Sequence, residues 1–146
     1  MNPTPPDSIA RWRFLFLLAV IAGLLTFPSP ARATSNYEYR SDEYAPLSGG
    51  RSPDGKYAIT AHGEGELGYD NFHLYLMDGR TGRKIGPLEE VADVLDTAPG
   101  SFFVEWSADS RFVSIGYRID RRETRTVRFR VEKGRAFFVR KVENKR

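Results

Sequence analysis

The stretch from Ser52 to Met77 constrains the fold of this chain more than any other. It opens with Ser52-Pro53-Asp54-Gly55, continues as an alternating segment over 56–62 and, after a polar loop, ends in residues 72–77. Pro presets φ for a turn, Gly accepts a positive φ, and Asp bonds its own backbone. Residues 72–77 are largely apolar in both alternating sets, which is typical of a strand covered on both faces. The stretch therefore predicts a turn followed by a strand hairpin whose second strand is central in a sheet.

The same punctuation returns 55 residues later as Ser107-Ala108-Asp109-Ser110-Arg111, so that Asp54 corresponds to Asp109. Strand-like alternation occurs in both halves of the chain. The predicted strands cover 37–47, 56–62, 72–77 and 83–86, and then 101–106, 111–117, 124–132 and 135–142. Two blade-like halves, 37–86 and 101–142, are therefore predicted, each with four strands.

These motifs resemble a known repeat. Residues 52–57 before a strand, followed by Leu-Tyr-Leu-Met-Asp and a Gly-rich turn, are similar to the blade repeat of TolB-type, WD40-like β-propellers. The second copy, over 103–111, resembles the same motif with Ser110 in place of glycine. Propellers typically place four to eight blades around a channel, and this chain has two at most. The resemblance therefore implies blade-like sheets that close in another way, as a sandwich, as a flattened barrel or as a ring completed by oligomerisation.

Aromatic residues on the inner faces allow two sheets to bury each other within one chain, which favours the sandwich or flattened barrel. Residues 87–100 depart from the strand pattern. Apolar residues recur there at helical spacing, at Leu88, Val91, Ala92 and Leu95. The predicted fold class is all-β, with two four-stranded antiparallel blade-like sheets and one short helix over 88–96 that turns Asp93 and Asp96 outward. An irregular crossover is the alternative to that helix.

Residues 1–33 are interpreted as a secretory signal peptide. Two arginines form a charged n-region, residues 14–27 form an apolar run, and Ala31-Arg32-Ala33 supplies a small-x-small cleavage signature. The run is shorter than the roughly 20 residues that span a bilayer, so cleavage is favoured over a retained anchor. We expect cleavage after Ala33 and a single all-β domain over 34–146, exported to the periplasm or the extracellular space.

Charge and cysteine content exclude several functions. Three of the 22 Lys and Arg residues and one of the 19 Asp and Glu residues fall within 1–33. The exported part is therefore close to neutral, and bulk electrostatic binding to nucleic acid is not expected. The chain has no cysteine, so disulfides and thiolate chemistry are excluded. No nucleophile elbow or phosphate-binding glycine loop is present, and we expect neither enzymatic activity nor a cofactor.

The polar loop over 63–71 collects several candidate site residues. Its acids are Glu64, Glu66 and Asp70, and His62 and His73 flank it. A metal site there is imaginable, with the two histidines as the candidate ligands. No recognised ligand spacing is present, so the preferred interpretation is a Gly-rich hairpin loop with solvated acids and no metal. A carboxylate pair for glycoside hydrolysis is disfavoured because such a pair needs a deep cleft and a rigid scaffold.

The last two strands are joined by Lys133-Gly134, a two-residue hairpin turn. That turn pairs Val131 with Ala136 and Phe129 with Phe138, which predicts one apolar face.

In the same register, Arg130 lies opposite Phe137 and Arg128 opposite Val139. Arg and aromatic residues are enriched where protein interfaces bind tightly. We therefore predict that these four residues form a binding surface. The alternative is an ordinary solvated sheet face that limits aggregation.

The sequence as a whole predicts an exported, non-catalytic module that binds a protein partner in the periplasm or cell envelope. One alternative is a small secreted enzyme inhibitor that presents the 63–71 loop. Another is a metal- or ligand-binding domain that uses the same loop. No contact with nucleic acid, or with a membrane beyond the signal segment, is expected, and the oligomeric state stays open.

Overall fold

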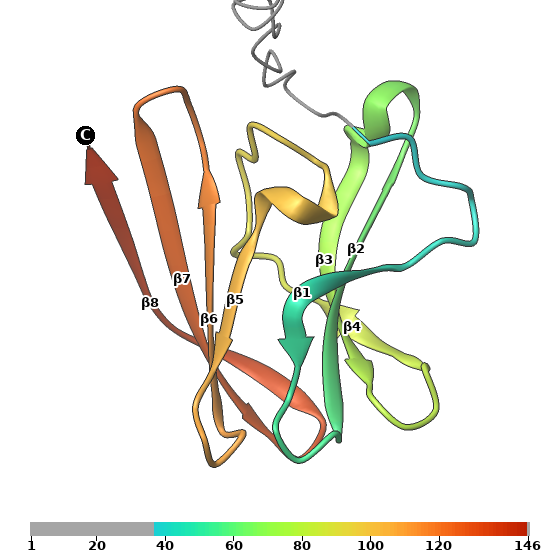
Figure 1. Ribbon diagram of the computed structural model, residues 1–146, viewed down its shortest axis with the longest axis vertical. Helices are drawn as coiled ribbons and strands as arrows, with labels where there is room; N and C mark the ends of the chain where they lie inside the picture. The colour runs from blue at the N-terminus through green and yellow to red at the C-terminus, as the bar shows by residue number, and fades with distance from the viewer. Residues whose placement is uncertain (1–36, 146) are drawn as a thin grey trace, which may run out of the picture. The chain divides into compact units, whose positions relative to one another are not determined.

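The computed structural model describes residues 37–145 (Figure 1). The predicted signal peptide over 1–33 lies outside these residues, so export and cleavage stay predictions. In the described part of the chain, no helix is long and apolar enough to cross a membrane.

The described chain is all-β, and its strands form two four-stranded antiparallel sheets, each in sequence order. The first sheet contains β1 (Ala45–Arg51), β2 (Tyr57–Glu64), β3 (Asp70–Asp78) and β4 (Lys84–Pro87). The second contains β5 (Phe103–Trp106), β6 (Phe112–Arg118), β7 (Glu123–Glu132) and β8 (Arg135–Lys145). Within residues 37–145 the only helical elements are the 3-10 turns η1 (Glu66–Gly68) and η2 (Pro99–Ser101). The predicted pair of four-stranded sheets is confirmed.

The repeated turns have the same internal hydrogen bonds in both sheets. Ser52 Oγ accepts a bond from Tyr57 N at 2.9 Å and donates to Asp54 Oδ1 at 2.7 Å. Ser107 makes the same two bonds, to the N–H five residues ahead at 2.9 Å and to Asp109 Oδ1 at 2.6 Å. Serine and aspartate side chains replace backbone partners in turns in this way. The sequence repeat is therefore also a repeat of local structure.

One position distinguishes the two turns. Gly55 has φ +69° and the corresponding Ser110 has φ +59°, a left-handed conformation that favours glycine. The Ser110 hydroxyl accepts a hydrogen bond from Asp54 N at 3.1 Å, so it joins the second turn to the first. A glycine at this position would leave that N–H without its acceptor, which gives a physical reason for the serine.

The core lies between the inner faces of the two sheets, which form a sandwich. Its fully buried side chains come from both sheets and include Ile59, Leu74, Val113, Ile115, Val127 and Phe129. The sheets meet where β1 and β5 lie side by side (Figure 1). There Trp106 Nε1 donates to Gly50 O at 2.9 Å, and a Cβ added to Gly49 would lie 2.5 Å from Val104 O.

The predicted helix over 88–96 is wrong, and the segment is an irregular crossover. Asp93 has φ +59°, which a right-handed helix does not allow. Leu95 N donates to Arg118 O at 2.9 Å instead of to its own preceding turn. Leu88 and Val91 are buried in the core. Of the residues at helical spacing, Ala92 is exposed and Leu95 is half-buried outside the core cluster, so the spacing does not mark one buried face.

Asp96 was predicted to face solvent and is instead only 6% exposed. Its Oδ2 lies 3.6 Å from Arg118 Nη1, and its buried Oδ1 has no hydrogen-bond partner within residues 37–145. The side chain is buried because the crossover lies against β6, where the arginine supplies the compensating charge.

The first strand is β1 rather than the predicted 37–47. Residues 48–50 had the composition of a loop, yet they lie in this strand. A Cβ on Gly50 would meet Ile59 O at 2.7 Å and Leu47 O at 2.9 Å. These glycines therefore allow close backbone packing. Residues 37–44, which were predicted to belong to the first strand, are held by a side chain instead of by sheet pairing. Tyr39 is buried, and its hydroxyl donates a hydrogen bond to Thr97 O.

The structure confirms three of the four predicted pairs in the last hairpin, Val131–Ala136, Phe129–Phe138 and Arg130–Phe137. Arg128 instead lies opposite Arg140, not Val139, because the register shifts by a bulge between Arg128 and Phe129. The predicted apolar face is also incomplete, since Phe138 is 48% exposed. It lies on β8, at the edge of the sheet, where fewer neighbours cover it.

Candidate functional site

The outer face of the second sheet, turned away from the core, brings together Arg and aromatic side chains. Register and alternation place Phe112, Arg128, Arg130, Phe137 and Arg140 there, together with Phe103 opposite Gly116. We call these six residues the Arg–aromatic face. Three of the four predicted surface residues belong to it. The fourth, Val139, is 46% exposed and lies at the bulge in β8.

Two of the arginines in this face lie over aromatic rings. The Arg128 guanidinium carbon is 4.8 Å from the Phe112 ring centroid, and that of Arg130 is 5.5 Å from the Phe137 ring centroid. Such cation–π contacts orient the guanidinium groups and contribute about 0.5–1 kcal/mol each at exposed sites. Arg130 also has an exposed ion pair with Glu132 at 3.8 Å. The arginines are therefore partly ordered on the surface.

Large apolar groups in and beside this face are exposed. Phe103 is 81% exposed and Phe137 is 43% exposed. The Phe103 ring is so exposed because its cross-strand neighbour is Gly116, which has no side chain to cover it. Val142, in the adjoining strand β8, is 41% exposed. Sequence analysis missed Phe103, although its place in the alternation of β5 put it opposite the buried set.

The acidic side chains of the 63–71 loop do not come together in one site. Glu64, Glu66 and Asp70 are all exposed, and Glu64 Oε2 accepts a hydrogen bond from Asn71 Nδ2 at 2.9 Å. The loop itself is fixed, since Thr97 Oγ1 donates to its backbone at Leu67 O at 2.7 Å. The structure thus presents an anchored loop with separate surface carboxylates.

The two histidines lie directly opposite each other on β2 and β3. His62 is buried, its Nδ1 contacts Glu43 O, and its ring stacks on Tyr44 at a centroid distance of 4.8 Å. His73 Nε2 lies 3.5 Å from a Glu89 carboxylate oxygen. Among the described residues, no group of three or more His, Cys, Asp or Glu is placed to hold a metal ion.

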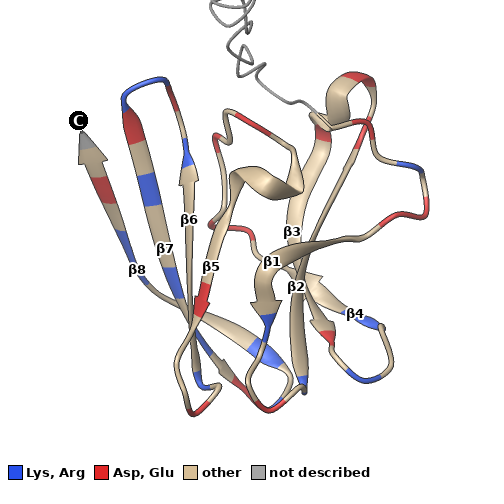
Figure 2. Ribbon diagram, in the orientation of Figure 1, with Lys and Arg blue, Asp and Glu red and all other residues tan. Residues whose placement is uncertain are grey.

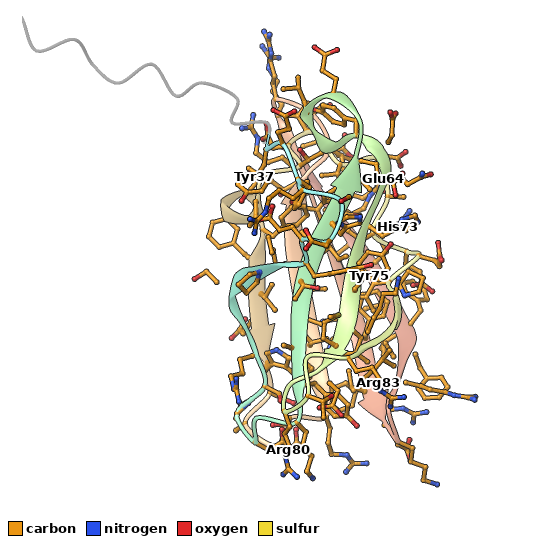
Figure 3. The ribbon with its side chains drawn as sticks, turned by 90° about the vertical axis from the view of Figure 1, so that its right-hand side faces the viewer. Tyr37, Glu64, His73, Tyr75, Arg80 and Arg83 are labelled. Atoms are coloured by element: carbon orange, nitrogen blue, oxygen red, sulfur yellow. The ribbon has the colours of Figure 1, made fainter. Side chains whose placement is uncertain are left out.

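An aromatic cluster on the outer face of the first sheet surrounds these histidines, and sequence analysis did not predict it. Lys84 Nζ donates to Tyr44 OH at 3.0 Å and lies 5.3 Å and 5.1 Å from the ring centroids of Tyr44 and Tyr75. This hydrogen bond to the Tyr44 oxygen raises the pKa of Lys84. Burial raises the pKa of Tyr75. Figure 3 shows Tyr75 beside His73 on this face.

A basic pocket at one end of the sheets was also not predicted. It lies among the β1–β2, β3–β4 and β7–β8 turns. Basic residues beside each turn were visible in the sequence, but the sequence does not show that these turns meet.

Comparison of the chain with protein-family models, with curated proteins and with solved structures found no significant match. The function is therefore inferred from the geometry of the surfaces described above.

Proposed function

We propose that the chain is an exported, non-catalytic protein-binding module of the periplasm or cell envelope, and that its partner docks on the Arg–aromatic face. The observation that carries this proposal is the exposure of Phe103 and Phe137 on one sheet face, where Arg130 lies over the Phe137 ring. Burying apolar surface in an interface is favourable by about 25 cal/mol per Å². A sheet face with this composition is therefore better suited to a contact than to solvent.

The chemistry of the face indicates the kind of partner surface that it fits. Guanidinium groups bind carboxylates through two parallel hydrogen bonds, and their planes stack on aromatic rings. Tight interfaces concentrate their binding energy in such Arg and aromatic anchors. The expected partner surface is therefore a protein surface with apolar contacts for the phenylalanines and acidic groups opposite Arg128, Arg130 and Arg140.

The resemblance of each half to a TolB-type, WD40-like propeller blade supports the same surface by analogy. In a propeller, several such sheets are arranged around one axis. The described chain has two sheets, so a face of each has no neighbouring sheet within the domain. An analogy at the level of fold does not by itself assign a function, and the composition of the face remains the main support.

The decisive experiment compares two double variants with the unaltered chain. Arg128→Glu plus Arg130→Glu reverses the charge of the Arg–aromatic face. Arg121→Glu plus Arg122→Glu makes the same charge change on exposed residues between β6 and β7 and serves as the matched control. A partner recovered from envelope extract is purified, and its affinity for all three chains is measured by calorimetry.

We expect the face variant to bind at least about tenfold more weakly, and the control variant to bind like the unaltered chain. Equal affinity for all three chains would refute the assignment of the surface. Export is tested separately by N-terminal sequencing of the secreted chain, which we expect to begin at Thr34. A mature chain that begins before Arg32 would contradict the proposed signal peptide.

The inhibitor function has one observation in its favour. Leu67, at the tip of the 63–71 loop, is 40% exposed and has φ +59°, while its carbonyl oxygen is fixed by Thr97. A loop held in its exposed shape loses little entropy on binding. If this loop inserts into an enzyme, Glu64→Ala plus Glu66→Ala will abolish capture of that enzyme from the extract. Arg128→Glu plus Arg130→Glu will leave the capture intact.

A further inference from the structure

Three of the turns at one end of the sandwich are joined by hydrogen bonds. Gly79 N, in the β3–β4 turn, donates to Lys56 O in the β1–β2 turn at 2.7 Å. Gly134 N, in the β7–β8 turn, donates to Tyr57 OH at 3.0 Å. The two sheets thus contribute turns to one shared surface, and its backbone positions are fixed by these contacts.

A pocket of about 470 Å³ lies among these turns. This volume falls within the range of sites that hold small molecules. Its lining residues are Lys56, Tyr57, Asp78, Arg80, Arg83, Lys84, Ile85, Lys133 and Gly134. Five of the nine are basic and one is acidic, so the pocket is strongly cationic, although residues 34–146 together are close to neutral.

Three of the cations form no ion pair with another described residue. In the described range 37–145, Arg80, Arg83 and Lys133 have no ion pair with a carboxylate. Figure 3 shows Arg80 and Arg83 projecting outward from the lower end of the first sheet, and in Figure 2 basic residues mark much of the β3–β4 connection. By contrast, the Lys84 ammonium binds Tyr44, and Lys56 Nζ lies 3.7 Å from Asp54.

The one carboxylate of the pocket is engaged by its own turn. Asp78 Oδ1 accepts hydrogen bonds from Thr81 N and Arg80 N, both at 2.9 Å. These two bonds lower the pKa of Asp78. The turn closes further through Asp78 N, which donates to Arg83 O at 2.8 Å. Asp78 therefore holds the backbone that carries both arginines.

We propose that this pocket binds a phosphate-bearing anion with at least two negative charges. Guanidinium forks match phosphate oxygens in geometry, and lysine ammonium groups act as point charges for phosphate. Three cations without an ion pair among residues 37–145 surround this pocket, which is more than a ligand with one carboxylate would need. Tyr57 and Ile85 add an apolar wall, which suits a ligand with an organic part beside its phosphate. This site is distinct from the Arg–aromatic face and does not depend on the proposed protein partner.

Two sources supply this chemistry, a small phosphorylated molecule and the headgroup of an anionic lipid. The test uses inorganic pyrophosphate in calorimetry, and vesicles of phosphatidylcholine with and without cardiolipin, a lipid whose headgroup carries two phosphates, in a sedimentation assay. The variants are Arg80→Glu plus Arg83→Glu, Lys133→Glu, and the charge-matched control Arg121→Glu plus Arg122→Glu. All are full chains, and the thermal unfolding of each is checked first.

We expect at least about tenfold weaker binding for the Arg80/Arg83 variant, a smaller loss for Lys133→Glu, and no loss for the control. Pyrophosphate binding with this pattern identifies a soluble phosphate ligand. Binding only to vesicles with cardiolipin, with the same pattern, identifies a lipid headgroup. Equal losses in the pocket and control variants, or no binding to either probe, would overturn the proposal. So would binding confined to a single-stranded oligonucleotide included as a third probe.

Discussion

Replacing Gly49 by alanine tests whether the two sheets are in contact at β1 and β5. Gly49 has φ +71°, and an added Cβ would lie 2.5 Å from Val104 O on the neighbouring sheet. Gly82, in the β3–β4 turn, has φ +70°, and no atom of the described residues lies within 4 Å of an added Cβ. Both substitutions strain a left-handed backbone to the same degree. Only the first also presses one sheet against the other.

The expected magnitudes follow from these two effects. A left-handed backbone conformation destabilises the folded state by about 1–2 kcal/mol for a residue with a Cβ. Alanine offsets part of this loss because it restricts the conformations of the unfolded chain. We therefore expect Gly82→Ala to lower the free energy of unfolding by about 1 kcal/mol. Forcing an added carbon into a packed contact costs about 1–3 kcal/mol more, so Gly49→Ala should lower it by about 2–4 kcal/mol.

The assay is urea unfolding followed by the fluorescence of Trp106, the one tryptophan within residues 37–145. This side chain lies at the contact itself, where it bonds Gly50 O. If the free energy of unfolding falls with urea concentration at the same slope in both variants, the same amount of surface is exposed on unfolding. Equal destabilisation by the two substitutions would refute the reasoning, because it would mean that β1 and β5 are not pressed together in solution.

Two further predictions concern the core and the repeated turns. Phe129→Ala should lower the free energy of unfolding by about 3–5 kcal/mol, whereas Phe138→Ala, at its cross-strand partner, should lower it by about 1 kcal/mol. The difference is expected because the Phe129 side chain is 1% exposed and that of Phe138 is 48% exposed. Chemical denaturation of both variants measures the two losses, and similar losses would contradict the difference in burial. Backbone and serine hydrogen bonds lower the pKa of Asp54, and serine and backbone hydrogen bonds lower that of Asp109. A carboxyl group whose pKa is lower in the folded state stabilises the fold above its unfolded pKa of about 3.9, and this contribution is lost as the pH falls further. Replacing both by asparagine should therefore flatten the loss of stability below about pH 4 in urea midpoints measured from pH 7 to pH 3, and an unchanged pH profile would count against these turns.

The surfaces were only partly predictable. Arg128, Arg130 and Phe137 were found because a two-residue turn fixes the register of the hairpin near it. The predicted pairing of Arg128 with Val139 failed farther from the turn, where a bulge shifts the register and places Arg140 opposite Arg128. Bulges depend on how a strand fits its neighbours in the sheet, and a single strand does not reveal that fit. Phe103 was missed because its exposure depends on Gly116 in another strand.

The sequence by itself determined the strand content, the division into two halves and the repeated Ser-x-Asp turns. These features arise from alternation and from hydrogen bonds within a few residues, so they are encoded locally. Only the tertiary structure decided that Gly49 and Gly50 belong to a packed strand, that the crossover is not a helix, and that three distant turns form a basic pocket. The physical reason is that burial and the summed charge of a surface depend on residues far apart in the chain, which folding alone brings together.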